Sequence, residues 1–482
     1  MLSSLIPSAV TRPLAKGSEA VRGALGSLTW GPGVAIAKST VLAFLSQIEI
    51  GTLTLVDETS GTRAVYGQDI PVSKKANGVN GVNGLHSHTR SATDIPRVEL
   101  VVHSESFWVR VLLFSDMGFS EAYMLGEVDC SNLIGWFQLF ILNRDRLGNG
   151  NTRLGSISRS ISTLMRSTNT LSNALLNISA HYDISNDMFA AFLSPDMTYS
   201  CPIWSSGPGS EDEPLESAQM RKLDRFIDGG HVKATDHVLE IGTGWGSLAI
   251  RAVQRTGCRV TSLTLSKEQK TLAEQRIAAA GFADRITVLL MDYRSLAGSP
   301  QYQGPYDKII SIEMLEAVGQ EYLATYFECI HNLLKKDSGI AVFQCITMPE
   351  GRHEAYSKSV DFINQYIFPG GYLPSTTQLL NHISAESDGT LIVEKVENIS
   401  GHYTKTLRLW REAFLNTFDA KIRPALKLEH KGMTDAEIRV FRRKWEYYFT
   451  YCEAGFITKT LGDVIITVGR EGALELMEGI PL

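Results

Sequence analysis

Residues 238–246 read Val-Leu-Glu-Ile-Gly-Thr-Gly-Trp-Gly, and this stretch decides the fold. An apolar, strand-like run leads into three glycines at every second position, and a helix-like run follows from Ser247 to Val253. Glycine lets the backbone turn sharply and approach a ligand closely. The helix that follows offers free N–H groups and the positive end of its dipole. The segment predicts a cradle for a nucleotide-type cofactor, although a glycine cluster alone also fits an ordinary tight turn.

The spacing of the glycines narrows the choice of cofactor. It is Gly-x-Gly-x-Gly and not the dinucleotide pattern Gly-x-Gly-x-x-Gly, which favours S-adenosylmethionine, a cofactor without a pyrophosphate. The next predicted strand has no acid at its end to bind a ribose, so Thr264 and Gln269 are the polar groups expected there. Asp292 and Tyr293 follow the third strand and suit the adenine amine and ring, with a surface turn as the alternative.

Composition describes a globular chain without an evident nucleic-acid or metal role. The 482 residues are 44% hydrophobic and carry a formal net charge of −6, so no broad basic field faces nucleic acid. The 6 cysteines form no CxxC pair, which argues against a structural metal or a disulfide framework and favours reduced thiols in the cytoplasm. No apolar run reaches the roughly 20 residues that a membrane-spanning helix needs.

The first 26 residues leave three interpretations open. Arg12, Lys16 and Arg22 face a single acid, Glu19, among many small and hydroxyl residues. Such a segment fits a mitochondrial presequence, a helix on a membrane surface, or an arm packed on the first domain.

Before the glycine turn, the pattern predicts a small α+β domain over 30–145 and a helical linker over 146–179. Polar, glycine-rich residues 72–96 interrupt the small domain and are expected to be a mobile insertion. The helices expected in this domain are Ser39–Gln47 and Trp136–Asn143. The strands expected there are Gly51–Asp57, Arg63–Tyr66, Val98–His103 and Phe107–Phe114.

Residues 180–482 alternate strand and helix patterns, which predicts an α/β fold with a doubly wound sheet and the cofactor at its carboxyl edge. The predicted strands are His237–Ile241, Arg259–Leu263, Ile286–Met291, Asp307–Ile312, Gly339–Ile346, Leu391–Glu397 and Asp463–Val468. The predicted helices are Ala218–Asp228, Gly246–Thr256, Lys267–Ala280 and Glu321–Leu334.

Several motifs in the same order resemble one lipid-modifying family. The motifs are His181–Asn186, Met197–Cys201, Leu239–Gly246, Leu263–Ser266, Ile367–Gly371, His402–Trp410 and Trp445–Phe456. Over about 180–470 the chain is similar to the cyclopropane-fatty-acyl-phospholipid synthases and mycolic acid cyclopropane synthases. The resemblance implies a Rossmann-like class I methyltransferase domain, and residues 30–145 resemble the family's smaller N-terminal domain more loosely.

The resemblance also implies a reaction. The family adds a methylene from S-adenosylmethionine across a cis double bond of an acyl chain. The alkene attacks the sulfonium methyl, a carbocation forms, and a base removes a proton as the ring closes. A bound bicarbonate is the base that the family implies, so S-adenosylmethionine and bicarbonate are the expected cofactors.

The implied catalytic residues map onto six positions. The bicarbonate holders correspond to the Cys201 backbone, Glu316, Ile346 and Tyr403. Gln344 stands where the bacterial members have a ligand histidine, and Ala317 replaces a second histidine, a combination that resembles eukaryotic members and puts the proton acceptor in doubt. Cys452 matches a reactive family cysteine and is interpreted as lining the pocket, because the chemistry needs no covalent step.

The implied cofactor contacts lie in the family's entry segment (His181–Asn186 and Met197–Cys201), the glycine turn and the ends of the following strands. They are Tyr199, Ser200, Glu240, Gly242, Gly244, Gly246, Thr264, Leu265, Gln269, Asp292, Tyr293 and Ile312. The aromatic residues that are expected to line an acyl tunnel, or equally to be ordinary core, are Phe368, Tyr372, Trp410, Trp445 and Tyr448.

The predicted activity is cyclopropanation of unsaturated acyl chains on phospholipids, with the N-terminal domain helping the enzyme dock on the bilayer. Three alternatives stay open: a methyl-branched lipid product, C-methylation of a sphingolipid or another alkene, and a non-catalytic lipid-binding protein. The expected partners are phospholipid acyl chains at a membrane surface and no nucleic acid. A peripheral membrane location and a homodimer are compatible with the sequence.

Overall fold

The computed structural model describes residues 31–68, 95–147, 185–207, 209, 210 and 212–481. The interpretations of the first 26 residues and of the linker at 146–179 fall outside the described residues, apart from 146 and 147. The insertion predicted at 72–96 is also outside them, apart from its last two residues. The chain divides into two compact units, Met1–Leu176 and Asn177–Leu482.

The first unit is a four-stranded sheet with helices. A helix over 31–45 precedes β1 (Gly51–Asp57) and β2 (Thr62–Gln68), and β3 (Arg97–Val102) and β4 (Val128–Cys130) complete the strand order β2-β1-β3-β4. Its other helices are α2 (Ser106–Leu125), α3 (Leu133–Leu142) and α4 (Arg144–Leu147). Along β1, buried residues alternate with half-buried ones, which is the pattern of a sheet covered on one face.

The strand predicted at Phe107–Phe114 is wrong. The segment is the first half of α2, which bends at Ser115 (φ 55°, ψ −124°). Phe107 and Trp108 are buried and the next residues are half-buried, so the run lacks the polar face of an amphipathic helix. A short apolar run of aromatic and β-branched residues cannot be assigned from its period, and packing made this one a helix.

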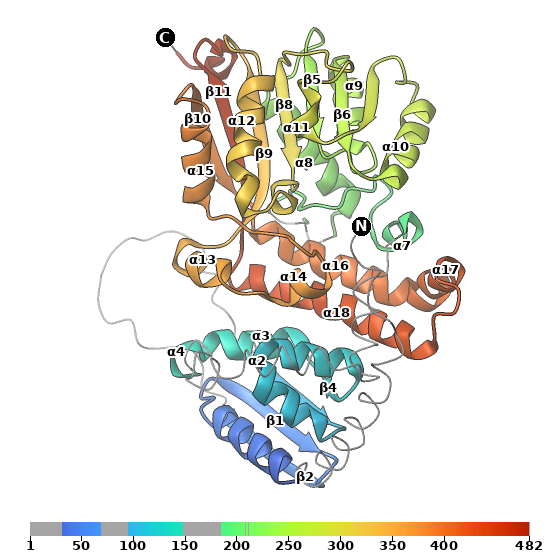
Figure 1. Cartoon of the computed structure of the whole chain (residues 1–482), viewed down its shortest axis with the longest axis vertical. Coiled ribbons are helices and arrows are strands. Elements are labelled where there is room, and N and C mark those ends of the chain that lie inside the picture. The colour runs from blue at the N-terminus through green and yellow to red at the C-terminus, as the bar shows by residue number, and fades with distance from the viewer. Residues whose placement is uncertain (1–30, 69–94, 148–184, 208, 211, 482) are drawn as a thin grey trace, which may run out of the picture. The chain divides into compact units, whose positions relative to one another are not determined.

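The second unit is a seven-stranded sheet in the order β10-β11-β9-β8-β5-β6-β7 (Figure 1). All seven predicted strands are confirmed to within three residues at each end. The bounds are β5 (His237–Ile241), β6 (Arg259–Thr264), β7 (Ile286–Leu290), β8 (Lys308–Ile312), β9 (Ile340–Thr347), β10 (Leu391–Asn398) and β11 (Gly462–Arg470). Strands β5 to β9 pair in parallel and β11 runs antiparallel to its neighbours, so the expected doubly wound α/β fold is observed.

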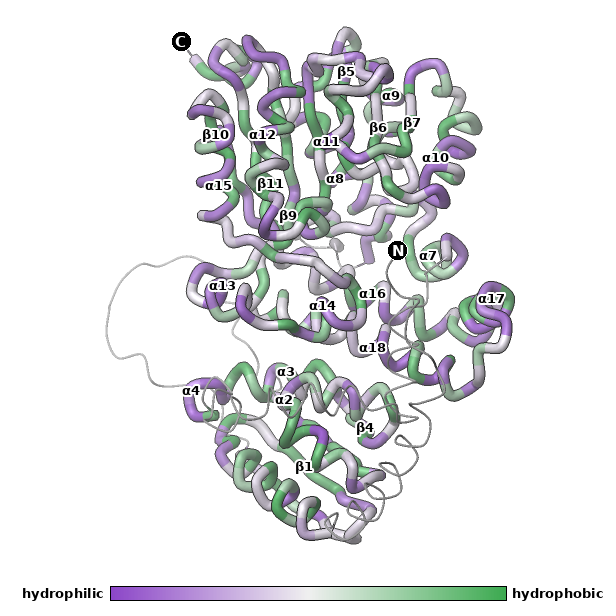
Figure 2. The backbone as a smooth tube through the Cα atoms, viewed as in Figure 1, coloured by the Kyte–Doolittle hydropathy of each residue, from purple (hydrophilic) through white to green (hydrophobic). Residues whose placement is uncertain are grey.

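Helices cover both faces of this sheet. Helices α8 (Leu215–Gly229) and α9 (Ser247–Thr256) contact each other on one face, and α12 (Leu323–Leu333) contacts α11 (Tyr293–Leu296) and α15 (Thr376–Ala385) on the other (Figure 1). A core of Leu239, Ile309 and Phe343 from the sheet, with Phe327 and Leu379 from α12 and α15, is fully buried. Figure 2 accordingly shows the central strands as mostly hydrophobic and α10 (Lys267–Ala279) as largely hydrophilic.

Three further helices bring residues to the carboxyl edge of the sheet. They are α7 (Asn186–Phe192), α16 (Gly401–Thr417) and α18 (Asp435–Ile457), and α16 contacts both of the others. Shorter helices at 350–357, 362–366 and 423–429 are α13, α14 and α17. Within the described residues, no helix is long and apolar enough to cross a membrane.

Candidate active site

The glycine turn has the backbone that its sequence predicts. Gly242, Gly244 and Gly246 have φ angles of 103°, 51° and 86°, which L side chains rarely adopt. The turn begins where Ile241 ends β5, and the N–H groups of Gly242 and Thr243 both donate to the carbonyl of Leu263 on β6. The turn is therefore fixed to the neighbouring strand, with α9 starting directly after it.

The space above the turn fits a cofactor. A Cβ added at Gly244 would meet no atom within 4 Å, and Leu265, just past β6, is an apolar side chain with 74% of its surface exposed. Glu240 is buried beside the turn and accepts a hydrogen bond from the Ser262 hydroxyl. Burial raises the pKa of Glu240 to about 8.

The other predicted cofactor residues gather along the same edge. Thr264 donates a 2.8 Å hydrogen bond to Gln269, and Asp292 caps α11 while its carboxylate pairs with Arg294 at 2.6 Å. Tyr293 is half-buried and packs edge-on against Tyr326, with a ring separation of 5.2 Å. Because these residues follow β6 and β7, next to the turn after β5, one ligand can reach all of them.

The entry segment packs on the glycine turn. Trp245 donates a 2.7 Å hydrogen bond from Nε1 to Asn186 on α7, and its ring lies 5.0 Å from that of Phe189. The hydroxyls of Tyr199 and Tyr448 are 2.8 Å apart, and Ser200 accepts a hydrogen bond from the buried Lys222. The hydroxyl of Ser200 is therefore engaged by Lys222 in this structure. The contacts of Trp245 with Asn186 and Phe189 connect the entry segment to the glycine turn.

A second group of polar residues follows β8, the strand beside β5. Glu313 comes directly after β8, which ends at Ile312, and Glu316 lies three residues further on in a short 3-10 helix. Between them, Met314 lies against the glycine turn, since a Cβ at Gly242 would be 3.4 Å from its Cγ. Five of the six predicted catalytic positions come together here: Cys201, Glu316, Gln344, Ile346 and Tyr403.

Glu313 is the centre of this group, and the sequence reasoning missed it. Its Oε1 accepts hydrogen bonds from the Cys201 backbone N–H and from Gln344 Nε2, both at 2.7 Å. Its Oε2 accepts from the Tyr403 hydroxyl at 2.6 Å. The available signal was a second glutamate directly after a parallel strand, at the sheet edge where ligands bind.

Glu316 and Asp463 are the other two acids of the group. The Ile346 N–H donates to Oε1 of Glu316 at 2.5 Å, and Oε2 of Glu316 has no partner among the described residues. Asp463, on β11, accepts from Gln344 Nε2 at 2.9 Å and was also missed. Burial raises the pKa of all three carboxyl groups, and the charge of Glu313 raises those of Glu316 and Asp463 further.

Cys452 stands apart from these hydrogen bonds. It lies on α18, and burial raises the pKa of its thiol, which keeps it protonated and unreactive. Tyr448 and Trp445 on the same helix pack edge-on with their rings 5.4 Å apart, and Tyr199 packs against Trp410 of α16 at 5.1 Å. Tyr372 is separate and hydrogen-bonds Gln378 and His353.

The residues that the resemblance implies for bicarbonate do not fit a bound bicarbonate in this structure. The Cys201 N–H and the Tyr403 hydroxyl each have one hydrogen, and both are donated to Glu313. Gln344 has two amide hydrogens, which go to Glu313 and Asp463. The remaining N–H, that of Ile346, is donated to Glu316. We therefore derive no step through this ion.

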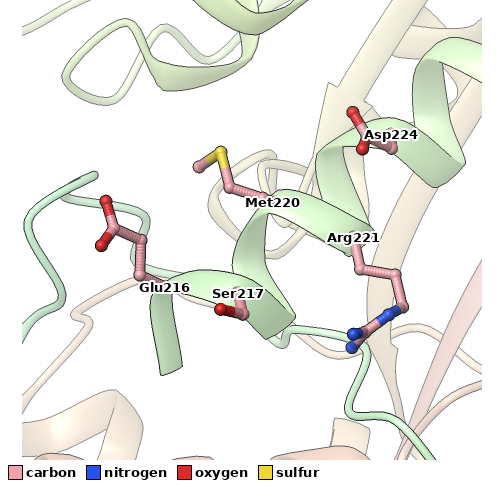
Figure 3. A pocket seen from close by; sticks show the side chains of 5 residues that line it. All are labelled: Glu216, Ser217, Met220, Arg221 and Asp224. Atoms are coloured by element: carbon pink, nitrogen blue, oxygen red, sulfur yellow. The ribbon is translucent and has the colours of Figure 1, made fainter. Parts of the chain in front are cut away.

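A surface hollow beside α8 contains none of the predicted site residues. Figure 3 shows the five residues that line it: Glu216, Ser217, Met220, Arg221 and Asp224. Two of its charged side chains are already paired, Arg221 with Glu213 at 2.5 Å and Asp224 with Arg251 at 2.7 Å. The described part of the chain has no cluster of His, Cys, Asp and Glu that could hold a metal ion.

Comparisons with known proteins identify the family of the chain. Residues 169–465 match the family described as mycolic acid cyclopropane synthetase. The chain is 40% identical to tuberculostearic acid methyltransferase UfaA1 of Mycobacterium tuberculosis, over 74% of this chain and 79% of that one. It is 29% identical to the cyclopropane-fatty-acyl-phospholipid synthase of Escherichia coli, over 78% and 90%.

A solved structure shares the fold over more than half of the chain. Mycolic acid cyclopropane synthase CmaA1, complexed with SAH and CTAB, matches 61% of this chain and 98% of its own with a TM-score of 0.51 and 30% identity. The family and the class I methyltransferase fold predicted from the sequence are confirmed. The chain therefore belongs to the mycolic acid cyclopropane synthetase family and is an S-adenosylmethionine-dependent methyltransferase of the cyclopropane synthase type.

Proposed function

We propose that this enzyme transfers the methyl carbon of S-adenosylmethionine to the cis double bond of an unsaturated acyl chain on a phospholipid, forming a cyclopropane ring. The observation that carries the proposal is the contact of Met314 with Gly242, which brings the acids Glu313 and Glu316 beside the cofactor turn. An alkene is a weak nucleophile, so the reaction needs a carbocation-stabilising group next to the methyl donor.

When bound, S-adenosylmethionine supplies an electrophilic methyl group. The chain's residues have three tasks around it. The glycine turn, with Glu240 and the Thr264–Gln269 pair, holds and orients the donor. The aromatic residues Tyr199, Trp410 and Tyr448 exclude water and offer ring faces to a developing cation. The negative charge of the three neighbouring acids (Glu313, Glu316 and Asp463, called the acid group below) stabilises the cation. One of these acids accepts the proton that the cation loses.

A methyl-branched product is the second candidate. The relative UfaA1, at 40% identity, is named a tuberculostearic acid methyltransferase. A branched alkene with one added carbon arises from the same carbocation by a hydride shift and proton loss, and a saturated methyl-branched chain would need a separate hydride donor. The family resemblance implies bicarbonate as the proton acceptor, but its donors are committed to side chains here, so the acceptor that we propose is an acid of the chain itself.

The substrate source that we propose is a membrane surface carrying unsaturated phospholipids, with residues 30–145 assisting the docking. The chain covers 90% of the Escherichia coli relative, whose name specifies a fatty-acyl-phospholipid substrate.

The test is product analysis. Purified full-length protein is incubated with S-adenosylmethionine and vesicles of a mono-unsaturated phosphatidylethanolamine or phosphatidylglycerol, and the acyl chains are analysed by mass spectrometry and NMR. We expect a gain of one CH₂ with loss of the olefinic proton signals. Retained olefinic proton signals, including those of an exocyclic C=CH₂ group, would select the methyl-branched pathway. No mass gain on any mono-unsaturated lipid, with S-adenosylmethionine bound, would overturn the proposed function.

A further inference from the structure

Glu313 occupies the position at which the anion ligands of the site converge. The Cys201 N–H, the Gln344 amide and the Tyr403 hydroxyl all reach its two carboxylate oxygens within 2.7 Å. These are three of the five groups that the family resemblance assigns to a bound bicarbonate. A carboxylate and a bicarbonate present the same pair of oxygens to such donors, so the side chain substitutes for the ion.

The charge of the acid group is best placed on Glu313. Three buried carboxyl groups cannot all be ionised, because like charges in a low-dielectric site repel strongly. Glu313 alone accepts three hydrogen bonds, which stabilise its ionised form, whereas Glu316 and Asp463 each have a carboxylate oxygen without a partner in the described structure. The buried Lys222 also lowers the pKa of Glu313 by its charge. Glu316 and Asp463 therefore hold protons while Glu313 is the carboxylate.

The backbone of Glu313 has an unfavourable conformation, which indicates that the surrounding structure holds the residue in place. Its φ is 46°, in the left-handed region that a non-glycine residue enters only at a cost in free energy. Its N–H is held by the carbonyl of Gln344 at 2.9 Å. Strain of this kind persists where the surrounding structure holds a side chain in a working position. The residue as a whole is half-buried, and its Oε2 accepts a single hydrogen bond, so one lone pair of that oxygen is left over.

We propose that Glu313 is the catalytic base of this enzyme, a proton acceptor built into the chain in place of a bound bicarbonate. The inference rests on the proposed function. In the ring-closing step a C–H bond of the transferred methyl breaks, and its electron pair forms the new C–C bond to the cationic carbon. The proton goes to the free lone pair of Glu313 Oε2, which leaves a neutral carboxylic acid that returns the proton to solvent before the next turnover.

The first test is Glu313→Gln, with Glu321→Gln as the matched control. Glutamine keeps an acceptor for the Cys201 N–H but cannot take up a proton, so turnover should fall at least a hundredfold, the scale of a lost general base. The affinity for S-adenosylmethionine, measured by calorimetry, should stay within threefold. Glu321 is exposed and lies eight residues along the chain, so its variant controls for the change of charge.

The second test is chemical rescue of Glu313→Gly. Glycine suits a φ of 46°, which offsets part of the stability lost with the three hydrogen bonds, and the variant frees three donors for an external anion. Adding bicarbonate or formate should raise its turnover at least tenfold, with no effect on the wild type or on Glu321→Gln. A purely structural role of Glu313 would give no such rescue, and that result would overturn the proposal.

The wild type distinguishes the two ways of failing. We expect its turnover to be unchanged in buffer purged of carbon dioxide. A strict requirement of the wild type for bicarbonate, or full turnover in Glu313→Gln, would overturn the base assignment and leave the proposed function standing. A wild type that methylates no lipid would overturn the proposed function and the base assignment with it.

Discussion

The hydroxyl of Tyr403 donates a 2.6 Å hydrogen bond to Oε2 of Glu313, which joins helix α16 to the residue that follows β8. The ring of Tyr403 stacks on Phe456 of α18, with 4.6 Å between the ring centroids. The phenol is buried, and its single hydrogen is committed to the carboxylate. Tyr403 therefore holds Glu313 in place and stabilises its negative charge.

Replacing Tyr403 by phenylalanine should shift the pH dependence of the reaction. The hydrogen bond from Tyr403 lowers the pKa of Glu313, so its loss should raise that pKa and leave less carboxylate at neutral pH. The acidic limb of kcat/KM against pH should move to higher pH in Tyr403→Phe, with lower activity at pH 7 and partial recovery at pH 9. Tyr306→Phe, a buried tyrosine outside the site, is the control. An acidic limb that does not shift in Tyr403→Phe would contradict the claim that Tyr403 lowers the pKa of Glu313.

The sequence predicted the scaffold of the site well because its signals are local. The glycines at 242, 244 and 246 and the strand periodicity around them lie within one strand–turn–helix unit, where short-range patterns fix the backbone. The same kind of reasoning failed at Phe107–Phe114, where an apolar run without a polar face fitted a strand as well as a buried helix.

The role of Glu313 escaped the sequence because its contacts are long-range. Cys201 precedes it by 112 residues and Tyr403 follows it by 90, so no local pattern marks the three donors as neighbours. The family resemblance grouped the same donors, which do lie together in this structure, but it gave a bound ion as their acceptor. The position of Glu313 directly after β8 was the one local signal, and only the folded structure shows that these donors meet it.

Gln344→Met tests how much the hydrogen bonds from Gln344 to Glu313 and Asp463 contribute to the stability of the fold. Methionine has a similar length, but it removes both hydrogen bonds that Gln344 Nε2 makes to Glu313 and Asp463. A buried acceptor that loses its partner costs about 1–3 kcal/mol, so the free energy of unfolding should fall by about 2–4 kcal/mol. Urea denaturation measures this directly. The exposed substitution Gln320→Met should change it by less than about 0.5 kcal/mol, and an equal loss in both variants would contradict the argument.

Glu240→Gln should make stability less dependent on pH. Burial raises the pKa of Glu240 to about 8, above the value near 4.5 in an unfolded chain. Its protonated form therefore stabilises the fold fully below about pH 4.5, and that contribution is lost as the pH rises through about 8. Glutamine cannot ionise, so the urea midpoint of the variant should rise relative to that of the wild type between pH 6 and pH 9. The exposed Glu328→Gln should show no such gain, and a constant difference from the wild type would contradict the raised pKa.

Gly244→Ala and Gly281→Ala form a matched pair that isolates cofactor binding from backbone strain. Both glycines have positive φ, 51° and 78°, and a Cβ at either would meet nothing within 4 Å. Each alanine should therefore cost about 1–2 kcal/mol of stability through its backbone alone. Only the methyl group at 244 enters the space above the turn between β5 and α9, so only Gly244→Ala should weaken S-adenosylmethionine binding, by at least tenfold in calorimetry. Equal affinities in the two variants would place the cofactor away from the glycine turn.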